Sequence, residues 1–243
     1  MAVRVAVAGA SGRLGGVVCE VVEALDGFEL SGRLGSASRQ DEFADCDILV
    51  DVTTPEVSAG LVADAVGRGQ RVLVGTSGWS EDKIAGLAKQ LAGGADPAAR
   101  VLIVPNFSLA SQFATLFAKL AAPYFQTAEI IESHHAGKID SPSGTAVRTA
   151  ELIGEAATFT PPFAEQRARG EQHGGVQIHS LRSAGVVAQQ EVRFGGVGES
   201  LEIVHRTQSA DSYRAGLAAA LEWLASTDEP LTVGLERVLG FKL

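Results

Sequence analysis

The residue types best suited to moving protons and binding anions are concentrated in the segment 132–146. It contains two adjacent imidazoles and an ammonium group, supplied by His134, His135 and Lys138. A Pro-Ser-Gly-Thr sequence follows at 142–145, where it predicts a turn that opens a helix. The first N–H groups of a helix lack intrahelical partners and attract anions, so Gly144 and Thr145 would face a negative charge. The segment therefore predicts a carboxylate-binding site with proton donors beside it.

The apolar residues before the two histidines predict that both lie on a strand. Neighbouring side chains of a strand point to opposite faces, so His134 and His135 could share a site only if the backbone turns there, which Gly137 would permit. A metal site that adds Glu132 and Asp140 is one alternative, but the neighbouring lysine would repel a cation. A structural histidine beside an ordinary turn is another alternative. We favour a functional site without a metal, because several unusual residues coincide.

The N-terminal segment has the order of elements that a dinucleotide-binding turn requires. A valine-rich run at 2–8 predicts a buried parallel strand, and apolar residues at helical spacing follow from 17 to 25. Between them lies a turn with the spacing GxxGxxG, which departs from the common GxGxxG by one alanine. Its glycines would let a pyrophosphate approach the backbone at the helix N-terminus. The residues expected to contact this cofactor are Gly9, Ala10, Ser11, Gly12, Arg13 and Leu14.

The second strand, predicted at 28–34, indicates which cofactor binds. NAD-binding chains usually place an acid about 20 residues past the glycine turn, where it holds the ribose 2′-hydroxyl. Counting from Gly15 ends at Gly35, and no acid is found there. The neighbourhood instead offers donors suited to a 2′-phosphate, namely Arg33, Ser36, Ser38 and Arg39. We therefore expect NADPH and leave open the use of NADH; a solvated polar loop is the alternative.

Further strands predicted at 45–52, 70–74 and 100–104 each end in a loop. In an open parallel sheet, ligands bind outside the carboxyl ends of the strands, where these loops lie. The loops add cofactor-binding candidates, which are Gly75, Thr76, Ser77, Val104, Pro105, Asn106 and Phe107.

The second half of the chain has a different pattern. Helices predicted at 109–122 and 145–157 flank the histidine strand, and 176–206 alternates as antiparallel strands do. We expect an α/β fold in which a Rossmann-like doubly wound parallel sheet is joined by an α+β domain with a mixed, largely antiparallel sheet. The dinucleotide-binding domain would span 1–107, completed by 211–243, and the substrate-binding and tetramerisation domain would span 108–210.

The segment 132–146 resembles the signature of the 4-hydroxy-tetrahydrodipicolinate (dihydrodipicolinate) reductase family, Glu-x-His-His-x-x-Lys-x-Asp-x-Pro-Ser-Gly-Thr-Ala, with every fixed position filled. Shorter matches lie at 51–55, 75–79 and 105–108. The resemblance implies an NAD(P)H-dependent reductase that converts 4-hydroxy-tetrahydrodipicolinate, a small dicarboxylate, to tetrahydrodipicolinate with loss of water. This reaction belongs to diaminopimelate and lysine biosynthesis.

The resemblance also assigns roles to single residues. His134 would be a proton donor or acceptor and Lys138 a proton donor, and which of them delivers the proton stays open. His135 would bind the substrate, and one substrate carboxylate would lie at Gly144 and Thr145. The loop that begins at Gly75 would lie beside the nicotinamide. Two domains of this kind would close on the substrate and exclude water.

The junction near residue 210 departs from the family pattern. Ala210 stands where the family usually has an arginine, and Arg206 or Arg214 would have to compensate for it. The hinges are expected near Phe107 and Ala210. Arg182 is a weaker candidate for contact with the substrate, and a salt bridge at the sheet edge is the alternative.

Composition excludes several classes of partner. The formal net charge of −9 argues against nucleic acid and against an anionic membrane surface. No apolar run approaches the ~20 residues of a membrane span, and no signal segment is recognisable at the N-terminus. Cys19 and Cys46 have no ligand spacing and are expected to be free thiols in the cytoplasm.

A homotetramer is expected because the family forms one and because Val187, Val192 and Phe194 would lie on an open sheet face.

Two other functions remain as alternatives. The chain could be another two-domain NAD(P)-dependent enzyme, but a semialdehyde dehydrogenase needs a nucleophilic cysteine in its substrate half, and both cysteines lie in the other half. It could also be a non-catalytic NAD(P)H sensor, which would not need histidines and a lysine at a carboxylate site. A serine hydrolase is excluded because Ser143 lacks the GxSxG context.

Overall fold

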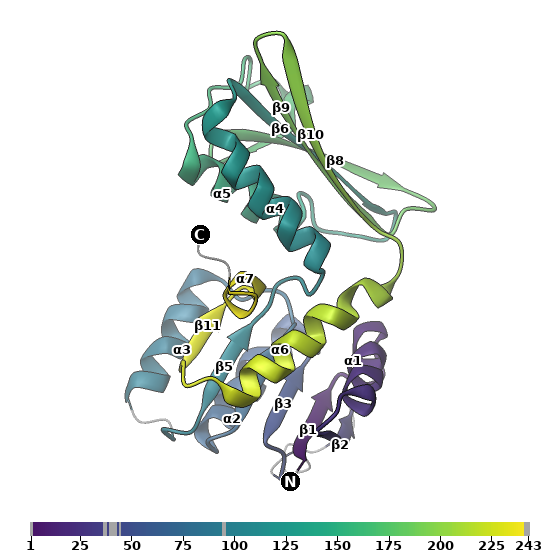
Figure 1. The fold of residues 1–243 in the computed structure, drawn as a ribbon, viewed down its shortest axis with the longest axis vertical. Helices are drawn as coiled ribbons and strands as arrows, with labels where there is room; N and C mark the ends of the chain where they lie inside the picture. The colour runs from purple at the N-terminus through teal and green to yellow at the C-terminus, as the bar shows by residue number, and fades with distance from the viewer. Residues whose placement is uncertain (1, 36–37, 39–42, 44, 94–95, 241–243) are drawn as a thin grey trace. The chain divides into compact units, whose positions relative to one another are not determined.

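The structure is a computed structural model that describes residues 2–35, 38, 43, 45–93 and 96–240 (Figure 1). The chain divides into two compact units. Unit 1 comprises Met1–Ser108 and Tyr213–Lys242, and unit 2 comprises Leu109–Ser212. Each unit has its own sheet and its own buried apolar core, so each is described separately.

Unit 1 is built on a six-stranded sheet in which all neighbouring strands are parallel. From edge to edge the strands are β11 (Leu231–Val233), β5 (Arg100–Ile103), β4 (Arg71–Val74), β3 (Ile48–Asp51), β1 (Val3–Ala8) and β2 (Phe28–Leu34). The central strands are runs of valine, leucine and isoleucine that are buried on both faces, as parallel strands usually are. The doubly wound sheet that the sequence predicts is confirmed.

The helices of unit 1 cover both faces of this sheet (Figure 1). They are α1 (Arg13–Ala24), α2 (Pro55–Gly67), α3 (Glu81–Gly93), α6 (Arg214–Ser226) and α7 (Leu235–Val238). Helices α2 and α3 share a core with Leu49 and Val72, whereas α1 and α6 pack together against the sheet. Helix α3 has no counterpart among the predicted elements, although Ile84, Leu87 and Leu91 recur at helical spacing and pack against the core of unit 1.

Unit 2 is a five-stranded mixed sheet with two long helices. The strand order is β10 (Glu199–Thr207), β9 (Ala188–Gly196), β6 (Thr127–His135), β8 (Val176–Ser183) and β7 (Glu171–His173). Strands β6 and β8 are parallel and the other pairs are antiparallel. The helices are α4 (Leu109–Ala121) and α5 (Gly144–Ala156), and short 3₁₀ turns lie at Ala122–Tyr124, Arg167–Arg169 and Ala210–Tyr213. The mixed, largely antiparallel sheet is as predicted.

One expectation about the sheet of unit 2 is wrong. Val192 and Phe194 do not lie on an open face, because they are 0% and 1% exposed and belong to the core with α4 and α5. Val192 lies opposite Ile130 on β6, and alternation along β9 then turns Phe194 to the same side. Val187 alone of the three is exposed. Sequence alternation gives the two faces of a strand but does not say which face the helices cover.

Candidate active site

The histidine segment lies where the central strand of unit 2 passes into a helix. Strand β6 is paired on both sides, with β8 and β9, and ends at His135. Helix α5 begins at Gly144, and the Ser143 hydroxyl caps it by accepting a hydrogen bond from the Ala146 N–H at 3.3 Å. The intervening loop therefore runs between a rigid strand end and a capped helix start.

Glu132 is the fully buried centre of this region, with an exposed fraction of 0%. One carboxylate oxygen is 2.5 Å from Nδ1 of His134, two residues along the same face of β6. The other accepts the Ser143 N–H at 3.3 Å, which links the strand to the start of α5. Arg182 of β8, which lies beside His134 in the sheet, binds both oxygens at 3.0 Å. We call Glu132, His134 and Arg182 the inner cluster.

Arg182 also binds the loop. Its Nε–H donates to the carbonyl of Lys138 at 3.3 Å, and its terminal nitrogens donate to the carbonyls of Asp140 at 2.5 Å and Leu181 at 2.7 Å. With the two bonds to Glu132, these bonds use the five N–H donors of a guanidinium group. The salt-bridge alternative for Arg182 therefore describes its geometry better than contact with a substrate.

The inner cluster shifts the pKa values of its members. Burial raises the pKa of Glu132, but hydrogen bonds from Arg182, Ser180 and His134 outweigh it and hold the pKa below its usual range. Burial lowers the pKa of His134, and the opposing hydrogen bond and charge of Glu132 do not restore it. An ionised carboxylate thus lies beside an imidazole that favours the neutral form.

Lys138 projects from the loop between β6 and α5. Its ammonium group lies 2.7 Å from both carboxylate oxygens of Asp140, and its side chain is 21% exposed. Burial raises the pKa of Asp140, but the hydrogen bond and charge of Lys138 outweigh it and bring it below the usual value. The lysine is thus held at the surface of the unit, within reach of solvent or a ligand.

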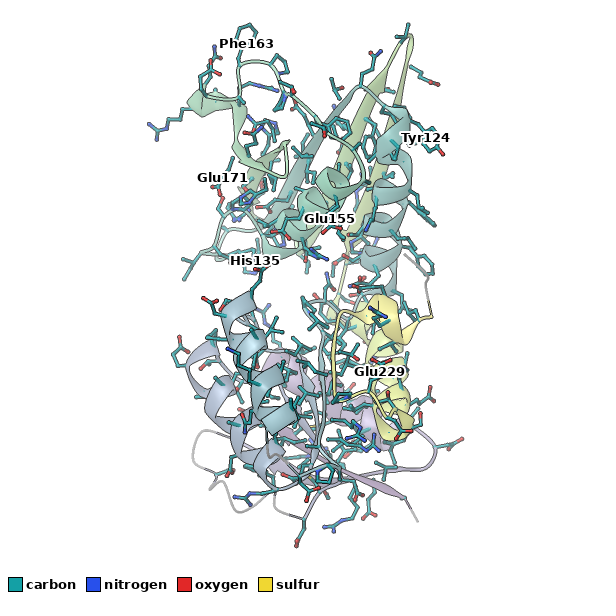
Figure 2. The ribbon with its side chains drawn as sticks, turned by 90° about the vertical axis from the view of Figure 1, so that its left-hand side faces the viewer. Tyr124, His135, Glu155, Phe163, Glu171 and Glu229 are labelled. Carbon is teal, nitrogen blue, oxygen red and sulfur yellow. The ribbon has the colours of Figure 1, made fainter. Side chains whose placement is uncertain are left out.

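The structure separates the two histidines that the sequence analysis considered together. Both remain on β6, where alternation turns His135 to the face opposite His134. The turn lies after His135, whose carbonyl accepts the Lys138 N–H at 3.0 Å. A Cβ added to Gly137 would lie 3.4 Å from Nδ1 of His135, so the ring lies close to this turn (Figure 2). The predicted roles of His135, Gly144 and Thr145 stay predictions.

The space beside the start of α5 is open. A Cβ added to Gly144 would meet no other atom within 4 Å. The neighbouring N–H groups of Ala146 and Val147 bond to Ser143, and the carbonyl of Thr145 accepts the Thr149 hydroxyl at 2.8 Å. An anion placed at Gly144 would therefore meet the positive end of the helix dipole without a steric barrier from that residue.

The glycine turn of unit 1 brings α1 close to β1. A Cβ at Gly15 would lie 2.1 Å from the carbonyl oxygen of Gly9, and one at Gly9 would lie 2.4 Å from the carbonyl oxygen of Val52. Gly12 is the N-cap of α1, and neither a capping side chain nor an acid in the first turn occupies this helix start. The remaining predicted contacts of the turn lie beside it, at Ala10, Ser11, Arg13 and Leu14.

Asp51 joins the loops at the carboxyl edge of the sheet in unit 1. Its side chain is fully buried and accepts hydrogen bonds from the Thr53 N–H at 3.0 Å, the Thr53 hydroxyl at 2.5 Å and the Thr76 hydroxyl at 2.9 Å. Ser58 bonds to its second oxygen and accepts the Trp79 indole N–H at 2.9 Å. The side chain of Thr76 therefore points into the unit, which leaves Ser77 as the exposed residue of this predicted cofactor loop.

The last predicted cofactor loop, at 104–107, is tied into the core. Val104 is buried and donates its N–H to the Val74 carbonyl at 2.8 Å, and the side-chain oxygen of Asn106 accepts the Ser108 N–H at 2.9 Å. Phe107 is buried, and a Cβ on Gly75 would lie 2.7 Å from its ring. Only a glycine fits between this ring and the side chain of Val52, so the loops at 75 and 104–107 are positioned together, and Pro105 is exposed beside them.

Arg33, the candidate for a 2′-phosphate, lies at the end of β2. Its guanidinium group is 2.6 Å from Glu23 of α1, and both side chains are about half exposed. A surface ion pair of this kind contributes about 0–1 kcal/mol, so a phosphate could displace the glutamate. Ser38 accepts the Gly35 N–H in a local turn, and Ser36 and Arg39 lie outside the described residues.

The two arginines near Ala210 have partners elsewhere. Arg206 donates to the side chain of Gln189 at 3.2 Å, within the sheet of unit 2. Arg214 is ion-paired with Glu20 of α1, within unit 1. Neither arginine is therefore shown to take the place of the arginine that the family usually has where this chain has Ala210.

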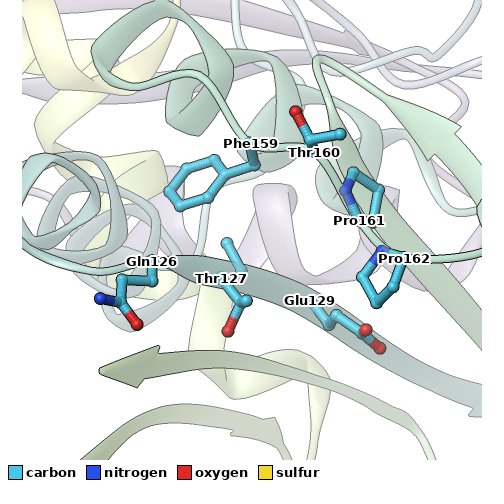
Figure 3. A pocket seen from close by; sticks show the side chains of 8 residues that line it. Gln126, Thr127, Glu129, Phe159, Thr160, Pro161 and Pro162 are labelled. Carbon is cyan, nitrogen blue, oxygen red and sulfur yellow. The ribbon is translucent and has the colours of Figure 1, made fainter. Parts of the chain in front are cut away.

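A second Glu–Arg–His group lies on the opposite face of β6. Glu129 is ion-paired with Arg169 and lies 2.8 Å from Nε2 of His179. We call these three residues the outer cluster. Glu129 also lines a small cleft with Phe159, Pro161 and neighbouring residues, and that cleft contains none of the predicted site residues (Figure 3).

Three further findings bear on the alternatives. In the part of the chain that the structure describes, no group of three or more His, Cys, Asp or Glu side chains is arranged to hold a metal ion. No helix among those residues is both long and apolar enough to cross a membrane. Cys19 and Cys46 are buried and free.

Sequence reasoning assigned no role to Glu132 or Asp51 that matches their geometry, and it left Arg182 between contact with the substrate and a salt bridge. The signal for Glu132 was its spacing of two residues from His134, which places both on one strand face. The corresponding signal for Asp51 was its place as the one acid at the end of an otherwise apolar strand. Arg182 gave no local signal, because its partners lie 42 to 50 residues away.

Comparison with known proteins identifies the family. The model described as "Dihydrodipicolinate reductase, N-terminus" matches residues 3–107, and "Dihydrodipicolinate reductase, C-terminus" matches residues 106–239. The 4-hydroxy-tetrahydrodipicolinate reductase of Clavibacter sepedonicus is 47% identical over 98% of this chain and 87% of its own length. The enzyme of that name from Thermobifida fusca is 40% identical, over 98% and 99%.

A solved structure agrees with these relatives. The dipicolinate-bound dihydrodipicolinate reductase from Paenisporosarcina sp. TG-14 is 26% identical, with a TM-score of 0.78 over 98% of this chain and 99% of that one. The two family models together cover almost the whole chain, and the signature at 132–146 lies within the second of them. The chain belongs to the dihydrodipicolinate reductase family.

Proposed function

We propose that the chain reduces 4-hydroxy-tetrahydrodipicolinate to tetrahydrodipicolinate with loss of water, and that unit 1 binds the cofactor while unit 2 binds the substrate. The chain is an NAD(P)H-dependent oxidoreductase of diaminopimelate and lysine biosynthesis. The observation that carries the proposal is that the inner cluster, Lys138 and the open start of α5 lie around the loop between β6 and α5.

The residues of unit 1 fit a dinucleotide. The close approach of Gly9 and Gly15 leaves the backbone accessible, and the uncapped start of α1 at Gly12 attracts a pyrophosphate. When bound, the reduced nicotinamide supplies a hydride. We propose a preference for NADPH, supported by Arg33 and by the absence of an acid near position 35, and leave the use of NADH open.

The residues of unit 2 fit a small dicarboxylate, the class to which the dipicolinate bound by the Paenisporosarcina relative belongs. Gly144 and Thr145 would bind one carboxylate at the helix start, and His135 would be a further ligand. Reduction of a conjugated imine places negative charge on the substrate, which the ammonium group of Lys138 stabilises and then neutralises with a proton. His134 completes the acid–base pair.

A homotetramer and a cytoplasmic location also belong to the proposal. The uncovered face of the sheet in unit 2 carries the exposed residues Leu181 and Val204, with Val187 nearby.

Helix α4 exposes Phe113, Phe117 and Leu120, and Tyr124 just beyond it is 84% exposed (Figure 2). Spacings of four and three residues put this row on one side of the helix. Sedimentation should give a tetramer, and a stable monomer would contradict it. The free cysteines are consistent with a reducing compartment.

An assay coupled to the preceding synthase tests the function directly. The purified chain should oxidise NADPH only when that synthase and its substrates are present, and NADPH should bind more tightly than NADH. No oxidation of either nucleotide would contradict the proposed function. Oxidation with a clear preference for NADH would leave the reaction intact and contradict the role given to Arg33.

A further inference from the structure

We propose that Glu132 and Arg182 are positioning residues of this reductase: they fix the imidazole of His134 in its Nδ1–H tautomer and hold the loop that carries Lys138. The proposal rests on the function given above for His134 and Lys138. It assigns neither Glu132 nor Arg182 a contact with substrate or cofactor.

The bonds of Glu132 determine the tautomer. An ionised carboxylate can only accept hydrogen bonds, and Arg182 supplies two permanent donors to it. The proton between Glu132 and His134 therefore lies on Nδ1 of the imidazole. In the neutral ring this leaves Nε2 as an acceptor with a free lone pair.

The charges around His134 favour that neutral ring. Glu132 on the same strand raises its pKa, but burial lowers it more strongly, and the cations Lys138 and Arg182 act in the same direction as burial. A neutral imidazole with an acceptor at Nε2 can orient a donor or take up a proton. The proton given to the substrate then comes from Lys138. The sequence alone left open whether His134 or Lys138 delivers it.

Arg182 joins the two halves of the site. The same guanidinium group that binds Glu132 also binds the carbonyls of Lys138 and Asp140. Rotation of the Glu132 carboxylate and displacement of the loop are therefore both resisted by one side chain, whose rigid fork a lysine cannot reproduce. Since its five donors are used within the protein, Arg182 acts on the reaction through His134 and Lys138.

The outer cluster supplies a matched control. Glu129 lies on the same strand as Glu132, and it too is paired with an arginine and a histidine. It holds no residue of the proposed site. A carboxylate that only stabilises the sheet would behave alike in both clusters, whereas a positioning role predicts an effect on His134 from Glu132 alone.

The test is a long-range ¹H–¹⁵N NMR spectrum of the full-length chain at neutral pH, with the His134 ring assigned by its absence in His134→Gln. We expect the Nδ1–H tautomer in the wild type, its loss in Glu132→Gln and no change in Glu129→Gln. The coupled assay should show kcat about 100-fold lower for Glu132→Gln, with KM changed by less than about threefold. If Glu132→Gln does not fold, Arg182→Lys replaces it in the coupled assay, where kcat should fall about tenfold while the Nδ1–H tautomer is kept, because Glu132 stays ionised.

An Nε2–H tautomer in the wild type, or an unchanged ring signal and kcat in the variant, would overturn the proposal. These outcomes are distinct from failure of the proposed function. The tautomer is measured without substrate, whereas failure of the function would appear as an inactive wild type in the assay.

Discussion

On each face of strand β6 in unit 2, a glutamate of the strand is paired with an arginine and a histidine, in two different settings. The inner cluster is centred on Glu132, which is 0% exposed, and its arginine binds both the carboxylate and the loop at 138–140. The side chain of Glu129 in the outer cluster is 32% exposed, and its arginine comes from a short 3₁₀ turn. The same chemical groups thus form a buried cluster bonded to a loop on one face and a more exposed cluster on the other, and burial and connectivity distinguish them.

The electrostatic consequences also differ. The pKa values of Glu132 and Glu129 are both lowered, since in each case the bonds from arginine and histidine outweigh burial. In the inner cluster the histidine also has a lowered pKa, because burial dominates it. The two clusters therefore provide a comparison in which one member should affect catalysis and the other should not.

The largest expected difference is in stability. Glu132→Ala would remove the buried carboxylate that Arg182, 21% exposed, is paired with, and removing one partner of a buried pair costs about 3–5 kcal/mol of unfolding free energy. Glu129→Ala should cost about 1 kcal/mol or less, because its partners are more exposed. Urea unfolding of both variants measures this, and equal losses would remove the basis of the comparison.

The next effect concerns Lys138, whose backbone carbonyl accepts a hydrogen bond from Arg182 of the inner cluster. Lys138→Ala should lower kcat at least about 100-fold, since it removes a proton donor and a stabilising charge. Lys119→Ala is the control, because Lys119 lies in the same unit and is also ion-paired, with Glu155 at 3.2 Å. A Lys138→Ala variant with the turnover of this control would exclude Lys138 from the mechanism.

A smaller effect is expected from the two arginines. Arg182→Lys keeps the charge but has three donors in place of five, so it should lower kcat about tenfold. Arg169→Lys should change kcat less than about threefold, because its ion pair with Glu129 lies on the face of β6 opposite the inner cluster. The coupled assay measures kcat for both variants. A larger loss of kcat in Arg169→Lys than in Arg182→Lys would show that the outer cluster is the one coupled to the site.

The smallest effect is the pH dependence of stability. The folded chain resists protonation of His134, whose pKa lies below the usual 6.5, while the unfolded chain does not. Stability should therefore fall as pH drops below about 6.5, and His134→Gln should reduce that slope. His205, whose pKa is also lowered by burial, should preserve part of it. Urea unfolding at several pH values measures the slope, and an unchanged slope would argue that His134 is not buried as described.

Much of this site was predictable, because its chemistry is concentrated in one segment. The spacing from Glu132 to Ala146 identified the family, and strand alternation was enough to place His134 and Glu132 together. The order of strand, glycine turn and helix predicted the sheet of unit 1 in the same way. These features are local, so they can be read from neighbouring residues.

The features that could not be predicted depend on distant partners. Arg182 reaches Glu132 from a strand 50 residues away, and the sequence left it between a substrate ligand and a salt bridge. The sequence placed Val192 and Phe194 on one face of a strand, which is correct, but only the packing of α4 and α5 decides that this face is buried. The Asp51 side chain binds three residues, Thr53, Ser58 and Thr76, of which Thr76 lies 25 positions away. Long-range packing therefore determined each of these outcomes.

A double-mutant cycle between Glu132→Gln and His134→Gln tests the central claim most directly. If Glu132 acts on the reaction through His134, the double variant should have nearly the same kcat as His134→Gln alone, which we expect to be about 100-fold below the wild type. Losses of kcat that multiply in the double variant would show two independent effects and contradict the account.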